Sequence, residues 1–393
     1  MQRKVLALCG GVGGAKLAYG LSKIVPPEEI IFLVNTGDDF IHFDLNISPD
    51  LDTVMYTLAE LNDPKKGWGL RDETWNNLEI LTKYGVDTWF QLGDKDLATH
   101  IRRTQLLKDG KKLSDVTKSL SQSLGVQHII LPMSENPVQT IVKTDKGELV
   151  FQEYFVKYQC APKVEQINYV GNETAEIPTY LKELINKNKF SGVIICPSNP
   201  YLSVDPILSI NEIKTFLVET DIPILAISPI IANDSIKGPT SKIMREMKIN
   251  PSVESIAQHY SELIDVLVID HKDANCQPMT DSMTFIVDSI YMSNSEEKIS
   301  LATNCLEKIK ELVLNNDMGT TGDADISSAV FKTSTIAVLS VGSTSSASDI
   351  CSAAPAYLDR ISTPGFDGFC AAIYSFATRF IPSRIELIQH TSA

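Results

Sequence analysis

Five short runs of apolar residues recur along the chain, and each has the length of one β-strand. They are Val5–Cys9, Ile30–Asn35, Gly192–Pro197, Ile222–Ile227 and Val266–Ile269. Because polar residues do not alternate with the apolar ones in these runs, we expect both faces of each strand to be buried. Such strands are typical of a parallel sheet that helices cover on both sides.

Two of the stretches between these runs have the apolar spacing of an α-helix. Ala15–Ile24 follows a glycine-rich turn, and Leu51–Leu61 has apolar residues at 51, 54, 55, 58 and 61. Asp50 is the predicted N-cap of the second helix. Strands that alternate with helices predict an α/β fold, with a three-layer Rossmann-like core and a mainly parallel sheet.

The alternation weakens between residues 64 and 190, which we interpret as an inserted, smaller α+β subdomain. A helix is expected over 94–107. A β-hairpin is expected from Gln139–Thr144 and Leu149–Val156, around the turn Asp145-Lys146-Gly147. The parallel pattern resumes at residue 192.

The composition changes near residue 315. The segment 315–393 contains 13 serines, 8 threonines and a single lysine, Lys332. A shift of this kind marks a boundary or an appended segment. We therefore predict one α/β domain over 1–314 and a Ser/Thr-rich C-terminal extension of unknown role over 315–393.

Charge and hydropathy exclude several classes of protein. The 393 residues include 49 acidic and 35 basic ones, for a formal net charge of −14, which argues against binding to nucleic acid or anionic membranes. No stretch reaches the roughly 18 apolar residues of a membrane helix, and no signal peptide is evident. Seven cysteines without C-x-x-C spacing favour reduced thiols. We predict a globular cytoplasmic protein with neither nucleic acid nor membrane as partner.

The strongest chemical signal is the segment Gly10–Lys16, GGVGGAK, directly after the first predicted strand. Glycines at such a position let backbone N–H groups surround a phosphate at a helix N-terminus. The segment lacks the Gly-Lys-Ser/Thr ending of a Walker A loop, and its adjacent glycines differ from the G-x-G-x-x-G fingerprint. The alternative is a tight strand-to-helix turn that binds no ligand.

Four carboxylates follow the second predicted strand and open the next helix. They are Asp38, Asp39, Asp50 and Asp52. The glycines at 10, 11, 13 and 14 are called the glycine turn below. Because the carboxyl ends of parallel strands meet at one sheet edge, the four carboxylates are expected to face this turn. Carboxylates are good Mg²⁺ ligands, so the pattern favours a metal-bridged phosphate ester. Alternatively, Asp50 only caps its helix and Asp52 only complements the helix dipole.

The segment 89–104, WFQLGDKDLATHIRRT, combines aromatic and basic residues. Trp89 and Phe90 could stack on a planar ligand, and Arg103 could reach a phosphate. The alternative is a set of core aromatic residues followed by a solvated basic helix face. Loops after two late strands carry Ser198, Asn199 and Ser228, which could hydrogen-bond a nucleotide.

Taken together, these segments resemble the 2-phospho-L-lactate transferase family. The resemblance spans about residues 3–314, and its segments occur in family order. They are GGVGGAKL (10–17), NTGDD (35–39), PDLDTVMYTLA (49–59), WGL-x-x-ET (68–74), WFQLGDKDLATHIRRT (89–104), LPMSENPVQT (131–140), FQEYFV (151–156), ICPSNP (195–200) and SPI-x(7)-KGP (228–239). The segment 315–393 matches nothing in the family.

The resemblance implies an enzyme of coenzyme F-420 biosynthesis, a transferase of a substituted phosphate group. Such an enzyme moves a 2-phospholactyl or phosphoenolpyruvyl group from its guanosine diphosphate ester to the ribityl hydroxyl of 7,8-didemethyl-8-hydroxy-5-deazariboflavin (FO). The products are (dehydro) coenzyme F-420-0 and GMP, Mg²⁺ is the cofactor, and a homodimer is expected. Which phospho-acid is transferred stays open.

The resemblance also implies a role for each group of candidate residues. Catalysis is expected from Asp50, as the base, and from Asp39. The expected Mg²⁺ ligands are Asp38, Asp39, Asp50 and Asp52, and the expected contacts of FO are Asp50, Trp89, Gln91, Asp94 and His100. The nucleotide and its phosphates are expected at Gly11, Gly13, Gly14, Lys16, Asn35, Thr36, Ser198, Asn199 and Ser228.

Two other functional classes fit the sequence less well. A non-catalytic nucleotide-sugar-binding regulator on the same fold would not need the segment 89–104. An NAD-dependent dehydrogenase would need a ribose-binding acid directly after the second strand, where Asn35-Thr36-Gly37 stands instead. Both observations favour the transferase.

Overall fold

The centre of the fold is a seven-stranded sheet, seen in a computed structural model that describes residues 3–276 and 283–319. The strands are β1 (Lys4–Cys9), β2 (Ile30–Val34), β5 (Ile129–Pro132), β9 (Phe190–Ile195), β10 (Ile224–Ile227), β13 (Val266–Asp270) and β14 (Thr284–Asp288). Their order is β14-β13-β10-β9-β1-β2-β5, and every neighbouring pair is parallel. The predicted parallel sheet is confirmed, with β5 and β14 added to the five predicted strands.

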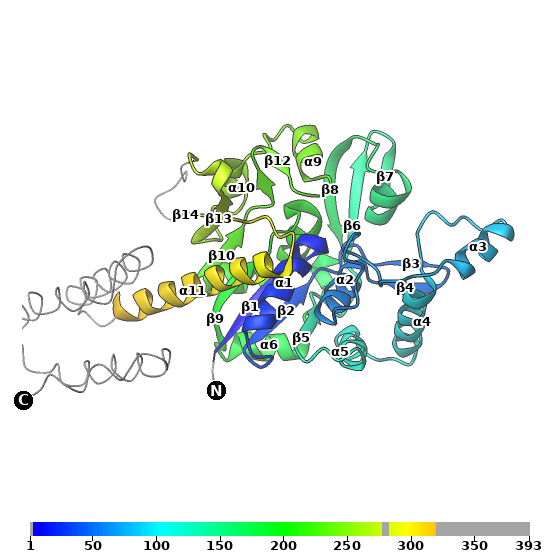
Figure 1. Ribbon diagram of the computed structural model, residues 1–393, viewed down its shortest axis with the longest axis horizontal. Helices are drawn as coiled ribbons and strands as arrows, with labels where there is room; N and C mark the ends of the chain where they lie inside the picture. Colours follow the sequence, from blue (N-terminus) through cyan, green and yellow to red (C-terminus); the bar gives the residue numbers. More distant parts are fainter. Residues whose placement is uncertain (1–2, 277–282, 320–393) are drawn as a thin grey trace, which may run out of the picture. The chain divides into compact units, whose positions relative to one another are not determined.

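Both faces of the sheet are buried, as the continuous apolar runs predict. In β1, Leu6 and Leu8 face one core cluster, whereas Val5, Ala7 and Cys9 face the other. The second cluster lies under α1 (Gly11–Ile24), α2 (Pro49–Leu58), α5 (Leu113–Ser123) and α11 (Ser295–Gly319). The first lies under α6 (Thr179–Asn186), α8 (Asn211–Glu219), α9 (Thr240–Glu246) and α10 (Val253–His259). The three-layer α/β architecture is therefore confirmed (Figure 1).

The first two helices begin earlier than the apolar spacing predicts. α1 starts at Gly11 and so includes the glycines that were expected to precede it. α2 starts at Pro49, whose fixed φ and missing N–H suit the first helical position. Ser48 is the N-cap, so the prediction that Asp50 caps this helix is wrong. Asp50 instead lies inside the first turn of α2.

The stretch 64–190 is not a single subdomain outside the sheet, because β5 pairs with β2 in the main sheet. One part outside the sheet is an arm made of β3 (Phe40–His42), β4 (Leu45–Ile47), α3 (Asn76–Lys83) and α4 (Asp94–Lys108). Figure 1 shows α3 far from the sheet, and none of its residues is buried. The predicted helix 94–107 is α4.

The other part outside the main sheet is a small antiparallel sheet. Its strands are β6 (Gln139–Thr144), β7 (Gly147–Val150) and β8 (Val164–Val170), in the order β7-β6-β8. The predicted hairpin is correct as far as Val150. Beyond it, the expected strand Leu149–Val156 is wrong, because the chain enters a helical turn, η1 (Glu153–Lys157).

The remaining described elements are short. They are η2 (Asn172–Thr174), η3 (Pro200–Val204), α7 (Asp205–Leu208), β11 (Ile230–Ile231), β12 (Asp234–Ser235) and η4 (His271–Asp273). Among the described residues, no helix is long and apolar enough to cross a membrane. The compact unit ends at Asp317, so the predicted extension lies, beyond residue 319, outside the described residues.

The sheet order places a switch point between β1 and β9. From β1 the chain continues to β2 on one side, and it later returns to β9 on the other side. Ligands of open parallel sheets bind at such a point, beyond the carboxyl ends of the strands. The loops that meet there follow β1 at Gly10, β2 at Asn35 and β9 at Cys196.

Candidate active site

A cavity of about 510 Å³ opens at this switch point. Its volume lies within the range of small-molecule sites, which is roughly 300–1,000 Å³. The walls come from the glycine turn, the first turns of α2 and α4, the aromatic segment before α4, the turn after β7 and the loops after β9 and β12. The polar and aromatic residues used below that line it are Lys16, Asp38, Asp50, Asp52, Tyr56, Trp68, Trp89, Phe90, Gln91, Asp96, His100, Gln152, Phe155, Ser198, Asn199 and Lys237.

The glycine turn is built for close backbone approach. Gly11 has a φ of +59°, which favours glycine. A Cβ on Gly13 would clash with the carbonyl oxygen of Pro197, and one on Gly14 would lie 2.8 Å from the Ser198 Oγ. The first turn of α1 holds no acidic residue and no side-chain cap. Its N–H groups therefore form a site that favours an anion.

Asp38 and Asp50 form a buried carboxylate pair beside the glycine turn. The Asn35 amide Nδ2 donates to both, at 3.2 Å to Asp38 Oδ1 and 3.0 Å to Asp50 Oδ2. Gln152 Nε2 donates to Asp38 Oδ2 at 3.2 Å, and the Gly11 N–H donates to Asp50. None of the ion pairs in the described part of the chain involves either carboxylate. The pair therefore has amide donors but no cation.

Burial without a cation changes the protonation of this pair. Burial raises the pKa of Asp50 to about 6, against the hydrogen bonds from Asn35 and Gly11. Burial and the charge of Asp50 raise the pKa of Asp38 well above its usual range. Two carboxylates held this close without a cation are expected to share protons or to bind a metal ion.

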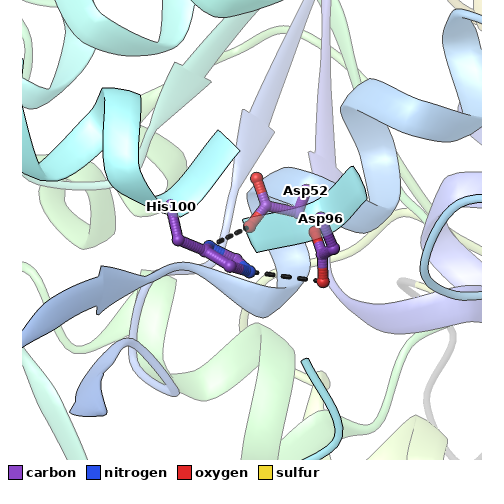
Figure 2. A group of neighbouring side chains, drawn as sticks. All are labelled: Asp52, Asp96 and His100. Atoms are coloured by element: carbon purple, nitrogen blue, oxygen red, sulfur yellow. Dashed lines mark ion pairs between the residues drawn. The ribbon is translucent and has the colours of Figure 1, made fainter. Parts of the chain in front are cut away.

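Asp52, Asp96 and His100 form a second group on the same cavity wall. Figure 2 shows the His100 ring facing both carboxylates, with Nδ1 3.7 Å from Asp52 Oδ2 and Nε2 3.2 Å from Asp96 Oδ2. Carboxylate and imidazole groups can both bind metal ions, and the possible ligand atoms here all lie within 4.8 Å of one another. This group could therefore hold a metal ion. Neighbouring side chains restrict that possibility.

Arg103 occupies most of the donor atoms of this second group. Its guanidinium forms a bidentate ion pair with Asp52, through Nη1 to Oδ2 at 3.0 Å and Nη2 to Oδ1. Nη1 also donates to His100 Nδ1 at 3.2 Å, which assigns the ring proton to Nε2, facing Asp96. Tyr56 Oη donates to Asp96 Oδ1 at 2.7 Å. Burial acts to raise the pKa of Asp96, but contacts with His100 outweigh it and the pKa lies below its usual value.

An aromatic surface forms another part of the cavity. Trp89 and Phe90 line it, with their ring centroids 5.6 Å apart, and Phe40 packs edge-on against Phe90 at 4.9 Å. Trp68 and Phe155 also line the cavity, and both keep more than a third of their surface exposed. Exposed aromatic rings beside polar groups suit a planar ligand with hydrogen-bonding edges.

Comparison with known proteins decides the family. Residues 5–309 match the family described as 2-phospho-L-lactate transferase CofD. The chain belongs to this family. It is 36% identical over 269 residues to a 2-phospho-L-lactate transferase of Methanosarcina mazei, which covers 68% of this chain and 88% of that protein. It is 35% identical over 318 residues to a phosphoenolpyruvate transferase of Streptomyces griseus, covering 79% and 99%.

Among solved structures, a UPF0052-family protein of Bacillus halodurans has a similar fold. The TM-score is 0.50 over 78% of this chain and 99% of that one, at 14% sequence identity. This likeness concerns the fold alone.

Most of the candidate residues of this CofD-family chain line the cavity. They are Gly11, Gly13, Lys16, Asp38, Asp50, Asp52, Trp89, Gln91, His100, Ser198 and Asn199. The Asn199 side chain uses only one of its two polar atoms within the described residues. Its Oδ1 accepts from the N–H groups of Tyr201 and Leu202, whereas its buried Nδ2 has no partner there. The Ser198 hydroxyl donates to the Gly10 carbonyl at 2.7 Å, so it joins the loops after β9 and β1.

Asp39 was expected among the catalytic and metal-binding groups, and it does not line the cavity. Its Oδ2 accepts from the Ser48 hydroxyl at 2.7 Å, and its buried Oδ1 has no partner. Burial raises the pKa of Asp39 well above its usual range. Asn35 and Thr36 do not line the cavity either, and Asn35 donates hydrogen bonds to Asp38 and Asp50.

Asp94 and Ser228 lie outside the cavity as well. Asp94 is half-buried, and its carboxylate accepts hydrogen bonds from Thr74, Asn76 and Asn77, at and just before the start of α3. These hydrogen bonds give Asp94 a structural role at the start of α3, and its expected contact with FO stays a prediction. Ser228 is buried, with its hydroxyl bonded to the backbone of Ile230. Gly14 contacts Ser198 behind the turn.

Sequence reasoning missed several cavity residues. One of them is Asp96. It precedes His100 by four residues and so lies on the same side of α4, a spacing that could have linked Asp96 to the site. Arg103 was expected to reach a phosphate, but it pairs with Asp52 inside the protein. No local signal marks Gln152, because it follows a strand of the small sheet.

Proposed function

We propose that this chain transfers a 2-phospholactyl or phosphoenolpyruvyl group from its guanosine diphosphate ester to the ribityl hydroxyl of FO. The products are (dehydro) coenzyme F-420-0 and GMP. Family membership supports the reaction class, since the relatives are named 2-phospho-L-lactate transferase and phosphoenolpyruvate transferase. The observation that carries the proposal is the pair Asp38 and Asp50, which lines the cavity beside the glycine turn without a cation.

The reaction needs one proton acceptor and one phosphate site. The hydroxyl oxygen attacks the phosphorus that bears the acid, a new P–O bond forms, and the bond from that phosphorus to the bridging oxygen breaks. GMP takes the bridging oxygen, and the hydroxyl proton moves to the Asp50 carboxylate. A carboxylate with a pKa of about 6 is mostly ionised at neutral pH and is still basic enough to accept a proton.

Asp38 and Asp50 are the residues that would hold Mg²⁺. Both are buried carboxylates in the cavity wall, both lack a cation, and oxygen ligands suit this hard ion. Bound there, Mg²⁺ would neutralise diphosphate charge. Asp52 fits less well, because Arg103 already pairs with both of its oxygens. We therefore propose Asp38 and Asp50, of the four expected ligands, as the Mg²⁺ ligands.

The two substrates would occupy different walls. The glycine turn and Lys16 would hold the diphosphate, and the free Asn199 Nδ2 would donate to the nucleotide. The deazaflavin ring would pack against Trp89 and Phe90, near Gln91 and His100. In the donor–acceptor complex, positioning and charge neutralisation supply most of the catalysis that phosphoryl transfer needs.

The direct test is a product assay with the full chain. FO and Mg²⁺ are combined in turn with guanosine diphosphate esters of lactate, enolpyruvate and glycerate, and GMP release is followed with the mass of the deazaflavin product. We expect product from one donor, which would also identify the acid. Nucleotide binding by the folded protein without product from any donor would contradict the transferase and favour a non-catalytic regulator.

A further inference from the structure

Two lysines line the mouth of the cavity without a carboxylate partner. Lys16 Nζ donates to the Met292 carbonyl at 2.8 Å, and Lys237 Nζ donates to the Lys66 carbonyl at 2.7 Å. Both residues line the cavity, and neither takes part in an ion pair of the described residues. Each ammonium has three donors, so each has two left beyond these carbonyl contacts.

Lys237 lies directly beside the glycine turn. A Cβ on Gly67 would be 3.5 Å from Lys237 Nζ and 2.6 Å from Val12 Cγ1. Val12 and Lys16 are one helical turn apart at the start of α1. The contact with the Lys66 carbonyl restrains the Lys237 ammonium at this position before any ligand binds.

Positive charge gathers around Lys16. Burial lowers its pKa, and the charges of Lys298 and Lys237 lower it further against the opposing charge of Glu297. Like charges held together at a cavity mouth repel one another unless an anion reduces their charge. The anion-favouring N-terminus of α1 adds to the same positive region.

The cavity therefore has an acidic and a basic end. Asp38 and Asp50 lie at one end, and Lys16 and Lys237 at the other, with the glycine turn between them. On the proposed function, which this step requires, the attacked phosphorus lies near Asp50 because the hydroxyl proton goes there. The second phosphate of the donor then lies at the basic end.

We propose that Lys237 binds the phosphate of the departing nucleoside monophosphate and neutralises the charge that develops on its oxygen. As the bond between the attacked phosphorus and the bridging oxygen breaks, that oxygen gains negative charge, and the Lys237 ammonium donates to this phosphate. No proton needs to leave Lys237 in this step. The residue acts on the leaving group, whereas Asp50 acts on the attacking hydroxyl.

The test compares Lys237→Met with Lys242→Met. Lys242 is the control, because its ammonium also donates to a carbonyl, that of Pro162, and pairs with Glu246, but it does not line the cavity. GDP binding is measured by calorimetry with Mg²⁺ present, and transfer is measured with the accepted donor. We expect Lys237→Met to weaken GDP binding about 10- to 100-fold, as for a lost charged hydrogen bond.

In the transfer assay, Lys237→Met should lower kcat about 100-fold, by analogy with the loss of one charge-stabilising donor. The KM for FO and the Mg²⁺ concentration for half-activation should stay unchanged, since both depend on the other end of the cavity. Lys237→Arg, which keeps the charge, should recover much of the loss. Wild-type GDP affinity and kcat in Lys237→Met would overturn the proposal.

A second readout needs no variant. Amine acylation of the wild-type protein, followed by mass spectrometry, should label Lys237 less when GDP is present, while Lys242 stays equally labelled. Equal labelling of Lys237 with and without GDP would contradict the proposal. GDP protection without transfer from any donor would refute the proposed function but keep the phosphate site, whereas transfer without any Lys237 effect would do the reverse.

Discussion

Two groups of buried carboxylates adjoin the same cavity, and they differ in the cations beside them. Asp52 is held by the Arg103 guanidinium, and Asp96 contacts His100 and Tyr56. Within the described residues, the donors to Asp38 and Asp50 are the amides of Asn35 and Gln152 and the backbone N–H groups of Gly11 and Asp38. A buried charge is costly unless it is paired. The first group satisfies that requirement within the protein, and the second leaves it to a ligand.

The difference separates a structural role from a chemical one. Arg103 links α4 to α2 through Asp52, so this group fixes the cavity wall. The acid pair lies where the glycine turn would bring a phosphate, and its charge remains available. Carboxylate count alone would favour the group around His100 as a metal site, whereas the distribution of cations favours Asp38 and Asp50.

The largest effect is expected from removing the charge of Asp50. Asp50→Asn keeps the shape but removes the proton acceptor and one metal ligand, so kcat should fall by about 10³-fold or more. Steady-state transfer kinetics measure this, with circular dichroism to confirm the fold. Lys214→Gln on the exposed surface of α8 is the control. Near-wild-type turnover of Asp50→Asn would contradict a chemical role for the Asp38 and Asp50 pair.

Removing Arg103 tests the structural side. Arg103 is 2% exposed, and Arg103→Met would leave Asp52 buried with no guanidinium. The free energy of unfolding should fall by about 3–5 kcal/mol, the usual cost of breaking a buried pair. Urea unfolding measures it. Lys182→Met, which removes the exposed pair with Glu212, should cost less than about 1 kcal/mol. Equal costs would contradict the account.

The acid pair also predicts a pH dependence of the metal-free protein. Burial raises the pKa of Asp50 to about 6, from 3.8. A carboxyl group with a raised pKa favours the folded state when protonated, so stability should fall as the pH rises from about 4 to about 6. The loss should reach about 3 kcal/mol, since each pKa unit is worth 1.36 kcal/mol. Asp50→Asn should lack this component of the urea-unfolding profile, and an identical profile in both proteins would contradict it.

The smallest effect is expected at Asp94. Its carboxylate accepts hydrogen bonds from Thr74, Asn77 and Asn76, and those bonds hold its pKa well below the usual range. Asp94→Ala should increase hydrogen exchange over α3 and leave the KM for FO within about twofold. An increase in KM without a change in hydrogen exchange would restore the direct contact with FO that the sequence favoured.

The sequence predicted the fold in more detail than the surroundings of the individual candidate residues. Continuous apolar runs identified five strands and their parallel arrangement, because burial on both faces leaves a mark in every residue of a run. β5 was missed as a sheet member, since Ile129–Pro132 lies in a region where the alternation weakens and its partner β2 is far away in the chain.

At the site, the glycine turn was visible because its spacing is local. The sequence did not show which acids are paired with a cation. That depends on Arg103, which is 51 residues after Asp52, and on Gln152, which is 114 residues after Asp38. The hydrogen bonds of Asp94 were not visible for a related reason, since its partners at the start of α3 precede it by 17 residues or more. A homodimer stays a prediction that solution mass measurement would test.

Metal binding tests the central comparison most directly. Mn²⁺, which has the same preference for oxygen ligands as Mg²⁺, is titrated into the wild-type protein, Asp38→Asn and His100→Gln, and bound ion is counted by electron paramagnetic resonance. We predict that Asp38→Asn weakens binding at least tenfold and that His100→Gln binds as the wild type does. Loss of binding in His100→Gln with full binding in Asp38→Asn would contradict the account, because the metal would then belong to the group that Arg103 neutralises.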